Sequence, residues 1–343
     1  MHEKPLLKNR TSGAANARAG GSSPGGTVRD VRGCQPTSRE ALKYVGLRDP
    51  RETLLDRAVW CKLASKSNKL LGVKWFITLA LGYGAALGLQ ERPSLPFNNT
   101  DFVPTHPTPV LYIHGINSRT ASFKENANHL AAQGFWVWGY DYGDMIAPGF
   151  FGVGDLDAIV EDVAHNVDRV LKETGAKQVD IVAHSQGALM TKMFIARGGA
   201  AKVRRVVAMG GNFHGTDMRG WAGRLGKVAA RYPRLTALLA SGASQQLVGS
   251  NWLKRFADVP DTDPSIVYTS IYSPRDHVVT PNSASHLNAV GGADVVNIDS
   301  GAVYNGYAPL HSLMPRNPLY AELTAWGLTR NVGDHTPPAI NIH

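Results

Sequence analysis

Residue 185 is a serine at the point where a buried strand is expected to turn directly into a helix. Residues 179–194 read VDIVAHSQGALMTKMF, with an apolar run before Ser185 and a second one after it. Packing gives no reason for a hydroxyl group at this junction. A serine in this place either caps the helix or is exposed to act as a nucleophile.

Small residues flank this serine where a sharp turn between a strand and a helix requires them. Ala183 stands two residues before Ser185 and Gly187 stands two residues after it. This spacing is typical of a nucleophile elbow, in which a strained backbone exposes the serine hydroxyl. The amino terminus of the following helix also offers N–H groups to a developing oxyanion. We therefore predict that Ser185 is a nucleophile, with the helix cap as the alternative.

A serine nucleophile needs a base that takes its proton and an acid that orients that base. In the strand–turn–helix arrangement, both follow the serine along the chain. Asp276 comes just after the apolar run 265–273, and His311 lies in a loop before the last predicted helix. We predict Asp276 as the acid and His311 as the base.

Four other residues compete for these two roles. Asp299 is the rival acid, and His277, His286 and His335 are the rival bases. His277 adjoins the predicted acid, and neighbours along a loop seldom point at the same spot. His286 precedes the sixth predicted strand, and His335 lies in the carboxyl-terminal tail.

An oxyanion hole requires two backbone N–H groups that point at one place. The residue after the nucleophile, Gln186, is expected to supply the first. The loop HGIN follows the first predicted strand, and the N–H group of Ile116 in this loop is the best candidate for the second.

Six apolar runs show no alternation of apolar and polar residues, and helical patterns separate them. This arrangement predicts a parallel sheet that is covered by helices on both faces. Apolar residues at helical spacing from Leu156 to Leu171 predict an amphipathic helix, which Gly175 is suited to end. Residues 186–197 and 318–328 predict two more helices. The six expected strands are residues 108–115, 134–143, 178–185, 203–211, 265–273 and 293–299.

About fifty residues separate the fourth and fifth predicted strands, which is too long for a bare loop in a compact domain. We predict a helical cap over about residues 212–262. Trp221, Leu225 and Leu238 are expected to contact the substrate from this cap. Arginines between the apolar residues could meet an anionic lipid interface or could be merely solvated.

Six blocks of the sequence, spread over roughly residues 105–328, resemble successive blocks of the lipase class 2 family. They read PVLYIHGINSRTASF, GFWVWGYDYGD, VDIVAHSQGALM, GGNFHGTD, YSPRDHVVTP and HSLMPRNPLY. The resemblance implies the α/β-hydrolase fold with a cap, and a secreted esterase or triacylglycerol lipase that needs no cofactor and no metal. It places Ser185, Asp276 and His311 at the positions of the triad. The chain has Ala188 where many relatives have glycine, and it lacks the cysteine pairs of some members.

The expected function is cleavage of carboxylic esters through an acyl-enzyme on Ser185. An acyltransferase or a thioesterase would use the same triad, and the two classes differ in what accepts the acyl group. A non-catalytic binding protein on a hydrolase scaffold is the third alternative.

The composition favours a globular chain that does not bind nucleic acid. Of the 343 residues, 43% are apolar and 18% are charged, so a sizeable core can form. The formal net charge is +9, but residues 1–74 hold 15 basic against 6 acidic residues and the remainder is neutral. The main domain therefore has no basic excess of the kind that nucleic-acid binding requires.

The amino-terminal quarter is expected to lie outside the catalytic domain, which we assign to residues 91–343. Residues 1–65 are basic, rich in Gly, Ser and Ala, and predicted to be disordered. Residues 66–90 combine lysines, a short apolar run and small residues, which predicts a signal peptide or a short membrane anchor and a secreted or extracytoplasmic protein.

We hypothesise that translation starts near residues 70–73 and that the upstream stretch is an artefact of the gene model. Both cysteines, Cys34 and Cys61, precede the apolar run, so a cleaved product would contain no disulfide.

Overall fold

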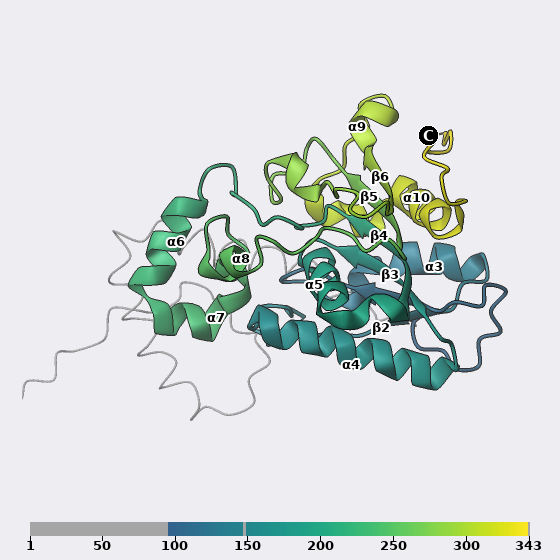
Figure 1. The fold of residues 1–343 in the computed structure, drawn as a ribbon, viewed down its shortest axis with the longest axis horizontal. Coiled ribbons are helices and arrows are strands. Elements are labelled where there is room, and N and C mark those ends of the chain that lie inside the picture. The colour runs from purple at the N-terminus through teal and green to yellow at the C-terminus, as the bar shows by residue number, and fades with distance from the viewer. Residues whose placement is uncertain (1–94, 147–148, 342–343) are drawn as a thin grey trace, which may run out of the picture. The chain divides into compact units, whose positions relative to one another are not determined.

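The computed structural model describes residues 95–146 and 149–341 (Figure 1). Six strands in this part of the chain form one sheet in the order β2-β1-β3-β4-β5-β6, and all neighbouring pairs are parallel. The predicted parallel sheet is confirmed. The predictions for residues 1–65 and 66–90 lie outside the described residues. The strands are β1 (Val110–Ile113), β2 (Val137–Gly139), β3 (Val179–His184), β4 (Val203–Met209), β5 (Val267–Tyr272) and β6 (Asp294–Asp299).

Helices cover both faces of this sheet (Figure 1). On one face, apolar side chains such as Ile159 of α4 pack in a core with Ile113 of β1. On the other face, Leu130 of α3 and Leu323 of α10 pack in a core with Tyr112 of β1. Neighbouring residues of β1 thus point to opposite faces, as strand geometry requires. The covering helices are α3 (Lys124–Ala132), α4 (Leu156–Thr174), α5 (Gln186–Phe194) and α10 (Pro318–Thr329).

The three predicted helices are present, with different ends in one case. Asp155 caps α4 by accepting hydrogen bonds from two backbone N–H groups, and Gly175 ends it with a φ of 70°. The helix after Ser185 is shorter than expected, because the regular α5 ends at Phe194 and a π-helical segment, Ile195–Gly199, follows it.

The helix α3 was not predicted. Its sequence, KENANHLAA, contains a single large apolar side chain, so it shows little amphipathic periodicity. Its buried Asn126 instead accepts a hydrogen bond from the Tyr112 hydroxyl (2.9 Å) and donates one to Thr324 Oγ1 (3.1 Å). Polar contacts of this kind attach α3 to β1 and α10.

The strand order reverses at β1, which lies between β2 and β3. The chain leaves β1 toward β2 on one side and later enters β3 on the other side. Loops that follow β1 and β3 therefore separate at the carboxyl ends of these strands, where ligands bind in open α/β sheets. Ser185 follows β3, and Gly115 and Ile116 follow β1 at this same edge.

The segment between β4 and β5 is helical, as expected for a cap. It contains α6 (Ala222–Arg231), α7 (Pro233–Gln245) and α8 (Asn251–Arg255), of which α7 lies beside the amino-terminal end of α4 (Figure 1). The Gln245 side chain in α7 accepts a hydrogen bond from the Leu156 N–H group (2.8 Å) and donates one to Asp155 (2.6 Å). The end of α7 is thereby attached to the first turn of α4. A short helix, α9 (Ser300–Val303), follows β6.

Among the described residues, the search for a helix of sufficient length and apolar character to cross a membrane finds none.

Candidate active site

Ser185 lies in a strained turn between β3 and α5. Its backbone angles are φ 55° and ψ −124°, a conformation that costs a residue other than glycine about 1–3 kcal/mol. Hydrogen bonds hold the turn in place, from Ser185 N to Met209 O (3.1 Å) and from Asn212 N to Ser185 O (3.2 Å). The Ser185 side chain makes no capping hydrogen bond to α5. Ser185 therefore occupies a strained turn between strand and helix, and its side chain does not cap the helix.

Close approach of the backbone explains why small residues surround this serine. A Cβ atom added to Gly187 would lie 2.3 Å from the Ile113 carbonyl oxygen. One added to Gly115 would lie 2.9 Å from the Ser185 Cβ atom. Both distances are shorter than any real Cβ contact, so the first turn of α5 can approach the end of β1 only with glycine at these positions.

The predicted acid and base contact one another. Asp276 lies in the turn after β5, and His311 begins the 3₁₀ helix His311–Arg316 before α10. The distance from Asp276 Oδ2 to His311 Nδ1 is 2.7 Å, and the two residues are 2% and 8% exposed. The other carboxylate oxygen accepts hydrogen bonds from the N–H groups of Val278 (2.8 Å) and Val279 (3.0 Å). This arrangement fixes the imidazole by its Nδ1 atom and leaves Nε2 for proton transfer.

The serine is connected to this pair through the end of β4. The Met209 carbonyl group, which accepts from Ser185 N, is followed by Gly210. A Cβ atom on Gly210 would lie 3.1 Å from His311 Nδ1 and 3.2 Å from Asp276 Oδ2. No hydrogen bond joins Ser185 Oγ to His311 in the described part of the chain. Such a bond often tightens only when a substrate is bound.

The rival residues have other surroundings. His277 is exposed, and the His286 ring packs 4.7 Å from the ring of Tyr272. His335 contacts Asp294 at 2.9 Å in the carboxyl-terminal part of the chain. Asp299 caps α9 by accepting from two backbone N–H groups. The structure brings Asp276 and His311 together, whereas three of the four rivals make other contacts and His277 is exposed.

The two predicted oxyanion donors belong to residues that are close to the serine in the chain or in space. Gln186 is the first residue of α5, and Ile116 follows Gly115, which packs against Ser185. Neither backbone N–H group donates a hydrogen bond to a group within residues 95–146 and 149–341. Both are therefore free to bind a developing negative charge, and this role remains a prediction.

Two buried histidines that the sequence analysis did not single out shape this edge. Burial lowers the pKa of His114 to about 4, so the ring is neutral near neutral pH. Its Nδ1 atom lies 2.8 Å from the Gly115 carbonyl oxygen, and its Nε2 atom accepts from Tyr142 N (3.3 Å). Both ring nitrogens are thus satisfied by one neutral tautomer, which fixes the loop that carries Ile116.

His184 precedes the serine and contacts the predicted base. Burial lowers the pKa of His184 well below its ordinary value, so this ring is also neutral. Its Nε2 atom lies 3.0 Å from the His311 carbonyl oxygen, and the two rings are 4.5 Å apart. His184 therefore ties the backbone of the base to the strand that carries the serine. A histidine at the end of an apolar strand was the only signal for this role.

The three residues predicted to contact the substrate belong to the cap. Trp221 is 52% exposed, with the Arg224 guanidinium 4.8 Å from its ring centre. Leu225 is half-buried. The side chain of Leu238 lies outside what the structure describes. Their contact with a substrate remains a prediction.

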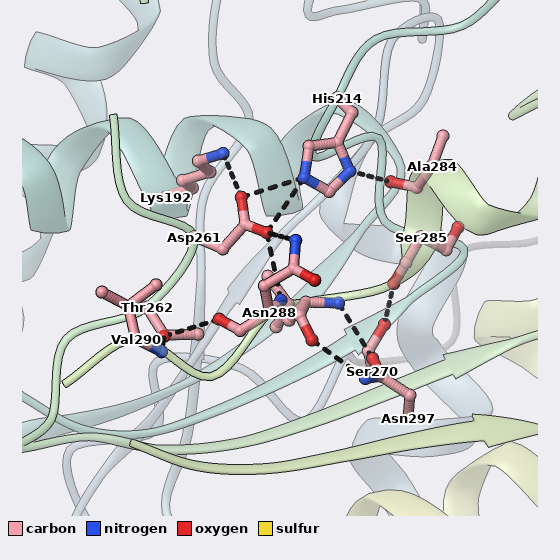
Figure 2. Close-up of polar contacts among 11 residues, drawn as sticks. Lys192, His214, Asp261, Thr262, Ser270, Ala284, Ser285, Asn288, Val290 and Asn297 are labelled. Carbon is pink, nitrogen blue, oxygen red and sulfur yellow. Dashed lines mark hydrogen bonds and ion pairs between the residues drawn. The ribbon is translucent and has the colours of Figure 1, made fainter. Parts of the chain in front are cut away.

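A buried carboxylate connects the two ends of the cap to α5 (Figure 2). Asp261 lies after α8, and its side chain accepts from Lys192 Nζ on α5 (2.6 Å). It also contacts His214 Nε2 near the start of the cap (2.9 Å) and accepts from the backbone and side chain of Asn288. This cluster could not be predicted from the sequence, because its four members are far apart in the chain.

The fold and the arrangement at the sheet edge define a class of protein. A parallel sheet with helices on both faces, a strained serine after β3, and a histidine–carboxylate pair after β5 and β6 are the features of the α/β-hydrolase fold. The same fold was expected from the sequence. Within the described residues, no group of His, Cys, Asp and Glu side chains is arranged to hold a metal ion.

The chain is similar in sequence to one protein family and in structure to several solved proteins. Residues 106–259, a little less than half of the chain, match the family described as serine aminopeptidase, S33. The chain is similar to the propeptide form of the lipase BlEst2 from Bacillus licheniformis, with a TM-score of 0.50 and 15% identity over 71% of this chain and 54% of that chain. This chain thus spans about half of that form. It is also similar to the carboxylesterase CesB from Bacillus subtilis, with a TM-score of 0.44 and 14% identity over 76% of this chain and 99% of that chain. The first of these two structural likenesses shows the fold.

Proposed function

We propose that this protein is a serine hydrolase that cleaves carboxylic esters through an acyl-enzyme on Ser185. The observation that carries the proposal is the 2.7 Å contact between Asp276 and His311 at the same sheet edge as the strained serine. A buried acid that orients a histidine beside an elbow serine is the arrangement that acyl transfer requires. The names lipase and carboxylesterase, which two similar structures carry, are consistent with an ester as the substrate.

The first half of the reaction forms the acyl-enzyme. His311 Nε2 takes the proton from Ser185 Oγ as this oxygen attacks the ester carbonyl carbon. Asp276 holds the Nδ1–H group and stabilises the imidazolium that results. The N–H groups of Ile116 and Gln186 bind the oxyanion, and one such donor is worth about 3–4 kcal/mol in a comparable enzyme. The tetrahedral intermediate then collapses, and His311 gives its proton to the departing alcohol.

The second half releases the acid with water as the nucleophile. His311 takes a proton from a water molecule, whose oxygen attacks the carbonyl carbon of the acyl-enzyme. The same N–H groups bind the second oxyanion. Ser185 Oγ leaves and regains its proton from His311, so that one ester and one water yield one acid and one alcohol.

The substrate class that we propose is a lipid ester, as the resemblance to the lipase class 2 family implies. The supporting observation is the surface of α6. Trp221, Val228 and Tyr232 recur at helical spacing and are exposed. Arg224, Lys227 and Arg231 are exposed beside them on the same helix. A helix with neighbouring apolar and basic surfaces suits an anionic lipid interface.

Hydrolysis of a series of p-nitrophenyl esters tests the proposal. The purified protein should hydrolyse acetate, butyrate, octanoate and palmitate esters, with a preference that defines the acyl length. The Ser185→Ala variant, with an unchanged thermal melt, should lose at least about 10⁴-fold in kcat. A variant that keeps a tenth of the wild-type rate would place the nucleophile elsewhere.

A further inference from the structure

Three buried side-chain amides form a continuous chain from the cap to the elbow. Asn212 Nδ2 donates to Gln246 Oε1 (2.9 Å), and Gln246 Nε2 donates to Gln186 Oε1 (2.6 Å). Gln186 Nε2 then donates to the Gly152 carbonyl oxygen (2.9 Å). All three side chains are buried. Because a buried amide is costly unless it is hydrogen-bonded, each member of the chain fixes the next.

The elbow end of this chain contacts both predicted oxyanion donors. Gln186 carries one donor in its own backbone. Gly152, which accepts from its side chain, packs on the loop that carries the other donor. A Cβ atom on Gly152 would lie 3.2 Å from the Gly115 carbonyl oxygen and 3.4 Å from Ile116 Cα. At the other end, Asn212 N donates to the Ser185 carbonyl oxygen (3.2 Å).

The middle member belongs to the cap. Gln246 directly follows α7, and its Nε2 atom also donates to the Gly242 carbonyl oxygen in that helix (3.0 Å). Its own carbonyl oxygen accepts from Thr216 N (3.0 Å), near the start of the cap. A displacement of α7 would therefore withdraw the donor that holds Gln186.

We propose that Gln246 is a positioning residue that couples the seating of the cap to the geometry of the oxyanion hole. With Gln246 in place, the Gln186 amide is held between Gln246 and Gly152, and the two N–H donors keep their separation. Without it, Gln186 Oε1 and Asn212 Nδ2 lose their partner, and the Gln186 side chain can rotate away from Gly152. The inference rests on the proposed ester hydrolysis and adds a control of that reaction by the cap.

The Gln246→Met variant tests this coupling, because methionine keeps the length of the side chain and removes its hydrogen bonds. The matched control is Gln245→Met, which removes the two side-chain hydrogen bonds that Gln245 makes with Leu156 and Asp155 and leaves the amide chain intact. Three readouts are needed: kcat and KM for p-nitrophenyl butyrate, the inhibition constant of an alkyl trifluoromethyl ketone, and the thermal melt. The ketone forms a hemiketal oxyanion on the serine and so reports on the oxyanion hole.

Gln246→Met should lower kcat by about 10- to 100-fold, with KM close to the wild-type value. It should raise the inhibition constant of the ketone by a similar factor. Gln245→Met should leave kcat and the inhibition constant of the ketone unchanged, even if its melting temperature falls as much as that of Gln246→Met. The double variant Gln246→Met with Gln186→Met should be scarcely slower than either single one, because both interrupt the same chain. If Gln246→Met does not fold, Gln186→Met alone should show the same loss.

Two results would overturn the inference, and they can be told apart. In the first result, the wild type hydrolyses the ester, and the Gln246→Met variant has the same kcat as the wild type. Gln186→Met takes its place if Gln246→Met does not fold. The coupling is then absent and the proposed function stands. If the folded wild type neither hydrolyses the ester nor binds the ketone, the proposed function fails and the inference fails with it.

Discussion

The Oδ2 atom of Asp276 lies 2.7 Å from the Nδ1 atom of His311, although the two residues are 35 positions apart in the chain. Each follows a different strand of the parallel sheet, and both reach the carboxyl edge at which Ser185 stands. The carboxylate is fixed from its other side by the N–H groups of Val278 and Val279. A histidine held in this way can accept a proton only at Nε2, which is what a general base beside a serine must do.

The base is tested by comparing two histidines. His311→Ala should lose at least about 10⁴-fold in kcat, as Ser185→Ala does, because the members of such a triad act as a unit. The double variant should be scarcely slower than either single one. His277→Ala is the matched control, since His277 adjoins the acid and is exposed. An active His311→Ala protein beside an inactive His277→Ala protein would move the base to the loop of the acid.

The sequence was sufficient to predict the sheet, and it also indicated three candidate triad residues, whose catalytic roles remain predictions. Buried parallel strands are apolar runs, and the tight turn at Ser185 demands small neighbours, so both leave local patterns. The order of serine, acid and base then follows from the connectivity of the fold. These features depend on short stretches of sequence or on their order.

The rest could not be predicted because it depends on contacts between distant residues. Gln246 and Gln186 are 60 positions apart, and nothing near either residue indicates the other. The helix α3 is attached by Asn126, a polar residue that is more often exposed. The roles of His114 and His184 follow from which carbonyl oxygens lie beside them, and this is a property of the folded chain alone.

The buried Asp261 should stabilise the fold in a pH-dependent way. Burial by itself raises the pKa of this carboxyl group, but the hydrogen bonds from His214 and Lys192 outweigh it and hold the pKa below the usual range. The contribution is therefore present above the pKa of the unfolded chain, about 4, and is lost as the pH falls further. Asp261→Ala leaves Lys192 buried without its partner and should lower the free energy of unfolding by about 3 kcal/mol at pH 7.

Urea denaturation at pH 7 measures this effect. Asp258→Ala is the control, because Asp258 is exposed in the same segment and should be replaceable without effect. An Asp261→Ala protein as stable as Asp258→Ala would show that the cluster in Figure 2 does not anchor the cap.

His114 should make the protein less stable in mild acid. Burial lowers the pKa of its ring from 6.5 to about 4. Below pH 6.5 the unfolded chain therefore binds a proton at His114, whereas the folded chain binds it only near pH 4. The free energy of unfolding should therefore fall between pH 6.5 and about 4, by about 3 kcal/mol from this residue alone. Denaturation of the wild type and of His114→Asn across this range measures the difference. Identical pH dependence in the two proteins would contradict the neutral buried ring.

The surface of α6 should bind anionic lipid. The wild type should associate with vesicles that contain phosphatidylglycerol and much less with vesicles of phosphatidylcholine alone. Val228→Asp with Tyr232→Asp should abolish this binding while a soluble short-chain ester is still hydrolysed. Val332→Asp, which changes an exposed apolar residue far from the cap in sequence, is the control. Equal vesicle binding by both variants would exclude α6 as the lipid-binding surface.

Covalent labelling of the folded protein with a fluorophosphonate tests whether Ser185 is the nucleophile. We expect one adduct per chain in the intact mass, located on Ser185 by peptide sequencing, with no adduct on Ser185→Ala. Ser265→Ala, which changes an exposed serine, should be labelled like the wild type. An adduct on any other serine, or a folded wild-type protein that takes up no label, would contradict the assignment of Ser185 as the nucleophile.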